Sequence, residues 1–208
     1  MSYADELCQL VIKNMEIIEE APKVVEHVEK RLFAAINARI EKAVRAQKNW
    51  NGCYDLVTDN DDKETTFAPS EWPEDEDGSY MASYTLHYME EGEGYAWLSV
   101  ATGVHGSALR LQFGLERHAI GTGAKVSVKE YKKFLHDFYN KTPVLAEAGF
   151  QITKDGIIYL PFALDASKLA EEYPSFAETL EPLDNALKTL FKEHYIFDSF
   201  IKSFYSAK

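Results

Sequence analysis

Two segments of the chain alternate apolar and polar residues with a period of two, and this pattern limits the fold more than any other feature. In residues 79–89 the alternating apolar positions are Tyr80, Ala82, Tyr84, Leu86 and Tyr88. In residues 107–116 they are Leu109, Leu111, Phe113 and Leu115, with Arg110, Gln112 and Glu116 on the other face. Successive side chains of a β-strand point to opposite faces. The pattern therefore predicts antiparallel strands with one buried face.

Three further strands are expected from neighbouring patterns. Residues 94–103 are interpreted as continuing the alternation between the two segments, so the three segments are predicted to form a meander joined by short loops. In residues 150–162, the pair Asp155-Gly156 separates two apolar runs. That pair is typical of a hairpin with a type I′ turn, which needs positive φ at both central residues. The sequence thus predicts about five strands, at 79–116 and 150–162.

Helical periodicity occupies the N-terminal quarter. Apolar residues recur every three or four positions, as Leu7, Leu10, Val11, Met15 and Ile18, and then as Val25, Val28, Leu32, Ile36, Ile40 and Val44. Because Pro22 is tolerated in a first helical turn and disruptive later, we expect helices at 4–20 and 22–48. The apolar stripe fits packing on the protein's own sheet or binding at a membrane surface. We favour the sheet, since glutamates mix with lysines on the polar side.

The remaining helices are predicted after the strands. Ser127 and Glu130 have the spacing of a capping box, which places a helix at 128–139. Two more are expected at 165–173 and 183–205, with prolines at the breaks. The last carries a wide stripe that suits either a partner helix or, as we favour, a cover for the sheet: Leu183, Leu187, Leu190, Phe191, Phe197, Phe200, Ile201 and Phe204. Residues 1–208 are therefore predicted to form a single α+β domain, a mainly antiparallel sheet packed against N-terminal and C-terminal helices.

The acidic residues are concentrated in one part of the chain. The formal net charge is −12, and residues 59–93 contain one base, Lys63, and twelve acids: Asp59, Asp61, Asp62, Glu64, Glu71, Glu74, Asp75, Glu76, Asp77, Glu90, Glu91 and Glu93. The rest of the chain is nearly neutral. Direct binding of nucleic acid to this segment is not expected, because like charges repel and no counterions would be released. Residues 58–78 are predicted to be an acidic loop longer than a typical connection.

This distribution leads to the main hypothesis, a non-enzymatic binding protein whose acidic surface engages a basic protein partner. The protein would then act as an inhibitor, an immunity protein or a nucleic-acid mimic, and the basic partner would be its target. The predicted contacts are Glu71, Trp72, Glu74, Asp75, Glu76, Asp77, Glu90, Glu91 and Glu93. Trp72, with the tyrosines at 80, 84 and 88, would supply apolar anchors. The alternative stays open that the aromatic residues are core and the acids only aid solubility.

Metal and catalytic motifs are incomplete. An EF-hand loop starting at Asp59 would place Lys63 at a ligand position, Glu64 at the glycine position and Ser70 at the bidentate glutamate. A cation among Asp59, Asp61, Asp62 and Glu64 stays open against a solvated turn. The chain has no H-x-x-x-H pair, no HExxH and no G-x-S-x-G. We therefore expect no complete metal site, no cofactor and no catalytic residue.

A nuclease of the D-(D/E)xK type is also disfavoured. Its two spellings, at 61–63 and 130–132, lie in a polar loop and a capped helix, where the motif needs adjoining strand ends.

One loop offers a second hypothesis, an enzyme or small-ligand protein that takes an anion. The bases of residues 117–125 surround a glycine pair just before a predicted helix: Arg117, His118, Gly121, Gly123 and Lys125. Glycine-rich backbone near bases is able to bind an anion. Neither the Walker A pattern nor the dinucleotide fingerprint is present, so a purely structural loop is favoured.

The compartment is inferred from what the sequence lacks. It has no apolar run of roughly 20 residues, the length needed to span a bilayer. Its first residues lack the basic n-region and the continuous apolar h-region of a secretory signal. Cys8 and Cys53 have no C-x-x-C spacing, so we expect reduced, part-buried thiols. These features favour a cytoplasmic protein that does not bind membranes.

Overall fold

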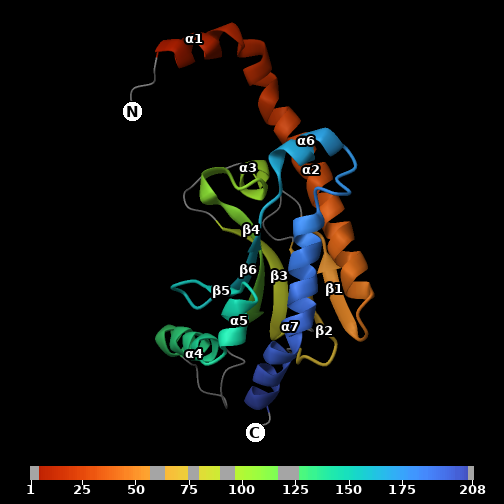
Figure 1. Ribbon diagram of the computed structural model, residues 1–208, viewed down its shortest axis with the longest axis vertical. Coiled ribbons are helices and arrows are strands. Elements are labelled where there is room, and N and C mark those ends of the chain that lie inside the picture. Colours follow the sequence, from red (N-terminus) through yellow and green to blue (C-terminus); the bar gives the residue numbers. More distant parts are fainter. Residues whose placement is uncertain (1–4, 57–63, 75–79, 90–96, 117–126, 206–208) are drawn as a thin grey trace.

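A computed structural model describes residues 5–56, 64–74, 80–89, 97–116 and 127–205. The described helices are α1 (Asp5–Lys13), α2 (Met15–Arg45), α3 (Trp97–Ala101), α4 (Val128–Asn140), α5 (Pro143–Glu147), α6 (Ala166–Glu172) and α7 (Glu181–Tyr205), with a short 3₁₀ turn at Val104–Gly106. The strands are β1 (Trp50–Tyr54), β2 (Thr65–Pro69), β3 (Ala82–Met89), β4 (Ala108–Leu115), β5 (Gln151–Ile152) and β6 (Ile158–Phe162). They form one antiparallel sheet in the order β1-β2-β3-β4-β6-β5 (Figure 1). The predicted α+β class is confirmed, with six strands in place of about five.

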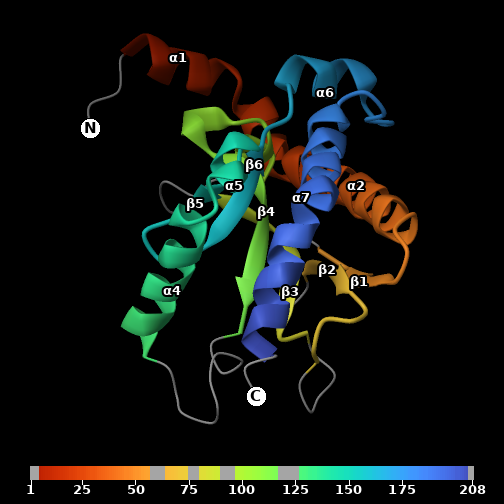
Figure 2. The same cartoon turned by 60° about the horizontal axis from the view of Figure 1, so that its bottom comes forward.

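The alternation that predicted β3 and β4 sets the two faces of the sheet. Tyr84 of β3 pairs with Phe113 of β4, which in turn pairs with Ile158 of β6, and all three side chains are buried on one face. Helices α2 and α7 pack on this face and lie side by side in both views (Figures 1 and 2). The two helices are joined by Arg39, whose guanidinium donates to both carboxylate oxygens of Asp184 at 2.8 Å.

Two predictions about the sheet were wrong. Residues 94–103 were expected to form a strand, but Trp97–Ala101 is helix α3. Its apolar residues form two adjacent pairs, Trp97-Leu98 and Val100-Ala101, and do not alternate. A carboxylate oxygen of Glu29 accepts a hydrogen bond from Leu98 N at 2.7 Å in the first turn. A glutamate at a helix N-terminus satisfies a free backbone donor.

Strands β1 and β2 were not predicted, and β2 occupies part of the expected loop at 58–78. β1 holds Gly52 where a side chain does not fit, because a Cβ there would lie 2.6 Å from the Tyr54 hydroxyl and 2.9 Å from Cβ of Phe67. The close approach requires glycine at this position. Because glycine interrupts an alternating pattern, the sequence did not predict the strand.

The hairpin at 150–162 is confirmed as β5 and β6, but its turn is not type I′. Only Gly156 has positive φ, at 86°, and Asp155 does not. Thr153 N donates to Ile157 O, and Gly156 N donates to Thr153 O. A longer loop with one left-handed glycine closes the hairpin, as is common for loops of more than two residues.

The C-terminal helices follow the predictions closely. Helix α4 has the predicted capping box, with Ser127 and Glu130 bonded reciprocally. Pro182 was expected to break the chain before a helix at 183, but it lies in the first turn of α7, where a missing N–H costs nothing. The α7 stripe covers the sheet as favoured, and Leu183, Leu190 and Phe197 are fully buried.

The N-terminal helices differ most from the prediction. The break falls at Asn14, whose side-chain amide donates to Leu10 O at 2.7 Å, and Pro22 lies inside α2. Residues 5–28, called the arm below, extend beyond the sheet (Figures 1 and 2). α1 has no buried residue, and large apolar side chains stay exposed along the arm: Leu7, Leu10, Val11, Ile12, Met15, Ile17, Ile18 and Val24. Packing on the sheet is thus wrong for the arm and right for residues 29–45.

Candidate binding surfaces

The polar face of the sheet contains a groove of about 530 Å³. Its floor follows the strand register, because Thr66 of β2 pairs with Thr85 of β3, and Thr85 pairs with Gln112 of β4. The two threonine hydroxyls lie 3.4 Å apart. The side-chain oxygen of Gln112 is buried and has no hydrogen-bond partner among the described residues. The floor is therefore rich in hydroxyl and amide groups, which are able to accept hydrogen bonds.

The charged residues that line the described groove are both acids. They are Glu64, just before β2, and Glu116, just after β4. A third acid, Glu74, forms a backbone bridge with Tyr80, which lines the groove. Burial raises the pKa of the Tyr80 hydroxyl, a hydrogen bond from Asn51 lowers it, and the nearby Glu74 carboxylate raises it. The groove thus presents negative charge and hydrogen-bond acceptors together.

Cys53 lies at the edge of the same groove. Its thiol donates to the Asp55 carboxylate at 3.3 Å. Burial raises the pKa of this thiol, and the Asp55 carboxylate raises it further. Cys8 and Cys53 are both free and both exposed, so the expectation of part-buried side chains was wrong. A raised pKa disfavours the thiolate form of Cys53.

The structure separates the predicted partner contacts that it describes. Glu71 and Glu74 are both exposed. The Glu71 carboxylate lies 3.9 Å from the Lys202 ammonium at the end of α7, whereas Glu74 lies beside the groove. The other predicted acids lie outside the described residues: Asp75, Glu76, Asp77, Glu90, Glu91 and Glu93.

Trp72 is a core residue, which contradicts its predicted role as an exposed anchor. The side chain is 3% exposed and packs against Tyr84 and Phe113. Its indole N–H donates to the Asp198 carboxylate at 3.4 Å. Burying an aromatic ring stabilises the folded protein far more than leaving the ring exposed in a solvated turn. The Trp72 ring therefore points into the core, although acids flank it in sequence. Tyr84 is also fully buried, Tyr80 is half-buried, and the side chain of Tyr88 lies outside the description.

The predicted anion loop also falls outside the described residues, with all of its members: Arg117, His118, Gly121, Gly123 and Lys125. The polar face of the sheet contains another base, Arg110, which was not proposed as a site residue. Its guanidinium lies 5.5 Å from the centre of the Tyr159 ring and 3.5 Å from the His87 ring nitrogen. Burial lowers its pKa. The ring contact accounts for the position of this cation without any ligand.

Within the described ranges, no three histidine, cysteine or acidic residues gather in a way that would hold a metal ion. Among the helices that the structure describes, none has the length and apolar character that crossing a membrane requires. Comparison of the chain with protein-family models, with curated proteins and with solved structures gives no match.

Proposed function

We propose that this chain is a non-enzymatic binding protein that engages a basic protein partner through its acidic segment, residues 59–93. The observation that carries the proposal is the groove on the polar face of the sheet. Its charged lining residues in the described structure are Glu64 and Glu116, and Glu74 lies next to it. The groove's volume of about 530 Å³ is large enough for a lysine or arginine side chain.

The chemistry of the groove favours a cationic donor. Lysine and arginine donate several hydrogen bonds and accept none, so they match a floor of hydroxyl and amide oxygens between carboxylates. A net charge of −12 also attracts a basic protein over distance and raises the rate of encounter. The proposal places this encounter in the cytoplasm, on the sequence grounds given above.

The apolar contacts of the groove come from its rim. Tyr80 and Met81 line it and are half-buried, whereas Trp72 is committed to the core. Aromatic side chains at the edge of a polar site exclude water from neighbouring ion pairs and strengthen them. Tyr80 therefore takes the anchoring role that Trp72 does not fill.

The proposal is tested with a charge-matched pair of variants. One replaces Glu64, Glu74 and Glu116 with glutamine, and the control replaces Glu147, Glu171 and Glu178, which are exposed acids elsewhere on the chain. Both change the net charge equally. Proteins captured at low and high salt are identified, and the binding of each purified candidate to the three proteins is then measured.

We expect a basic partner whose association slows and loses salt dependence with the groove variant but not with the control. Equal effects of the two variants would show that the total charge matters and not the groove. Capture that is insensitive to salt, or a partner that is not basic, would contradict the proposal.

A further inference from the structure

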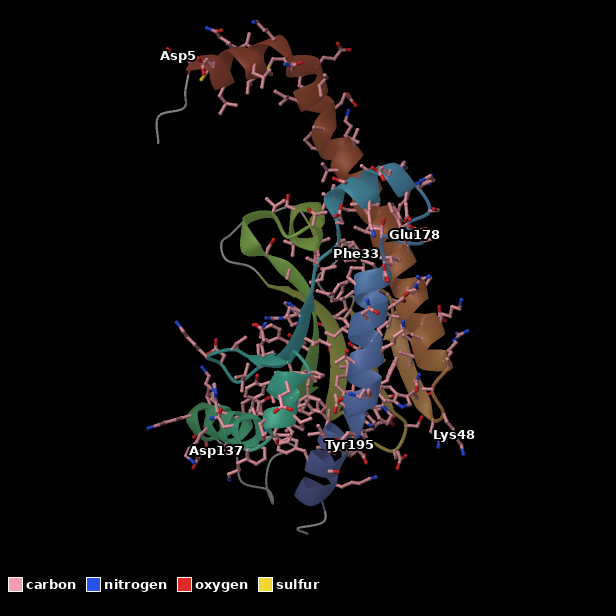
Figure 3. The ribbon with its side chains drawn as sticks, in the orientation of Figure 1. Asp5, Phe33, Lys48, Asp137, Glu178 and Tyr195 are labelled. Carbon is pink, nitrogen blue, oxygen red and sulfur yellow. The ribbon has the colours of Figure 1, made fainter. Side chains whose placement is uncertain are left out.

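Exposed apolar residues occur in both helices of the arm, and those of α2 form a line. Ile17 and Val24 are seven residues apart in α2, so they lie on one side of that helix, and they are 67% and 57% exposed; Leu10 of α1, beyond the break at Asn14, is 58% exposed. Figure 3 shows the contrast with the body, since Asp5 lies at the far end of the arm while Phe33 lies between the helices and the sheet. Large apolar patches on a soluble surface usually mark a binding site.

This line leads into a pocket at the base of the arm. The pocket has a volume of about 600 Å³ and is formed where the arm meets α3 and α6. Val24 and Val28 of the arm line one side, and Leu98, Leu169 and Tyr173 line the other. Such a pocket accommodates one large apolar side chain, and a ligand that lies along the arm would reach it without a gap.

The charge around the apolar line selects the kind of ligand. The arm contains two lysines, Lys13 and Lys23, and six acids, which gives it a net charge of −4: Asp5, Glu6, Glu16, Glu19, Glu20 and Glu26. Lys23 is paired with Glu20 at 3.2 Å. A second copy would bring a charge of −4 against −4, and an anionic membrane would also be repelled. A basic ligand is attracted by the same carboxylates.

We propose that the arm and the pocket at its base bind an amphipathic helix of a basic protein. Apolar side chains of that helix lie along Leu10, Ile17 and Val24, a large one enters the pocket, and its lysines or arginines face Glu16, Glu19 and Glu20. Helices commonly bind apolar surfaces through anchors spaced by three, four and seven residues. The inference rests on the proposed function for the basic nature of the partner, and it adds a second apolar contact surface to the one at Tyr80.

The test uses synthetic helices as probes, with lengths matched to the arm. A leucine and lysine helix with one apolar face is the positive probe, and its leucine and glutamate counterpart and an alanine and lysine helix are controls. The arm variant carries Leu10→Ala, Ile17→Ala and Val24→Ala, which keep helix-forming residues. The control variant carries Val104→Ala and Val128→Ala, two exposed apolar residues outside the arm.

We expect the leucine and lysine helix to bind wild type and the control variant equally, and to bind the arm variant at least roughly tenfold more weakly. The other two probes should bind weakly or not at all, because one lacks the positive charge and the other the apolar face. Equal binding of the leucine and lysine helix to wild type and to the arm variant would overturn the inference.

Further measurements separate this inference from the proposed function. The groove variant should bind the leucine and lysine helix as wild type does; a loss with that variant alone would leave the groove proposal standing and overturn the arm. Sedimentation of the free protein should give a monomer, and a dimer that the arm variant abolishes would identify a second copy as the ligand. Binding to anionic vesicles that depends on the arm would also overturn the inference.

Discussion

The two halves of the N-terminal helical region have the same sequence periodicity and opposite surroundings. In residues 29–45 the apolar stripe is core, and Ile36 is 0% exposed. In residues 5–28 the stripe faces outward, and Ile17 is 67% exposed. Helix α2 runs through both halves without interruption between Met15 and Arg45. An apolar stripe therefore predicts that a helix packs against another apolar surface, but not whether that surface belongs to the same protein or to a ligand.

The boundary between the halves has a physical cause at Glu29. This residue is the first buried one along α2, and its carboxylate holds the first turn of α3 through Leu98 N. One turn later, the rings of Phe33 and Trp97 meet edge to face at 4.8 Å. Buried contacts of α2 thus begin at Glu29, and the residues before it, up to Val24, only line the pocket that α3 and α6 form beside the arm.

The largest effect is expected from the same substitution placed in each half. Ile36→Ala removes buried methyl groups and should reduce the free energy of unfolding by about 2–5 kcal/mol. Ile17→Ala should change it by less than about 0.5 kcal/mol, because an exposed side chain buries little on folding. Urea denaturation of both variants measures the difference. Similar losses for the two would mean that the arm is part of the folding core.

A smaller effect is expected at the boundary. Glu29→Ala leaves the N–H of Leu98 without its acceptor and should cost about 1–3 kcal/mol. Glu26→Ala, one turn earlier, removes an exposed ion pair with Lys30 and should have no measurable effect. Thermal unfolding of the pair, with hydrogen exchange at α3, would show the difference. Equal stability of the two variants would place the boundary elsewhere.

The smallest expected effect is on the pH dependence of stability, through His194 on the face of the sheet that the helices cover. Burial lowers the pKa of His194 from its ordinary value of 6.5, the carboxylates of Asp198 and Glu71 oppose this, and the Lys202 ammonium adds to it. Because the unfolded chain takes up this proton first, the free energy of unfolding should fall as the pH drops below 6.5. Urea denaturation above and below that pH should show that the free energy of unfolding depends less steeply on pH in His194→Phe than in wild type. An unchanged slope would mean that His194 does not titrate differently on folding.

Much of the fold could be predicted from local patterns. The alternation in β3 and β4 was decisive because successive described side chains of those strands face the core and the polar face of the sheet in turn. The same rule failed at 94–103, where consecutive apolar residues fit a short helix or a buried strand equally well, and a distant side chain, Glu29, favours the helix. β1 was hidden because Gly52 is required by its contact with Phe67, a neighbour on another strand.

The candidate surfaces were less predictable for the same reason. Glu71, Trp72 and Glu74 are neighbours in sequence, yet one lies beside α7, one is buried and one lies at the groove. Only the tertiary fold separates them. The polar face of the sheet followed from the alternation, since Gln112 and Glu116 were placed opposite the core residues. The groove did not, because it depends on the pairing of β2 with β3, and β2 was missed.

The central claim is that the arm is a surface for a ligand and not part of the core. Hydrogen exchange along α2, measured in the free protein and with the leucine and lysine helix, tests it most directly. The account predicts strong protection at residues 29–45 in both states, and protection at residues 15–28 that is weak in the free protein and rises on binding. Equal protection of the two halves in the free protein, with no change on adding the helix, would contradict it.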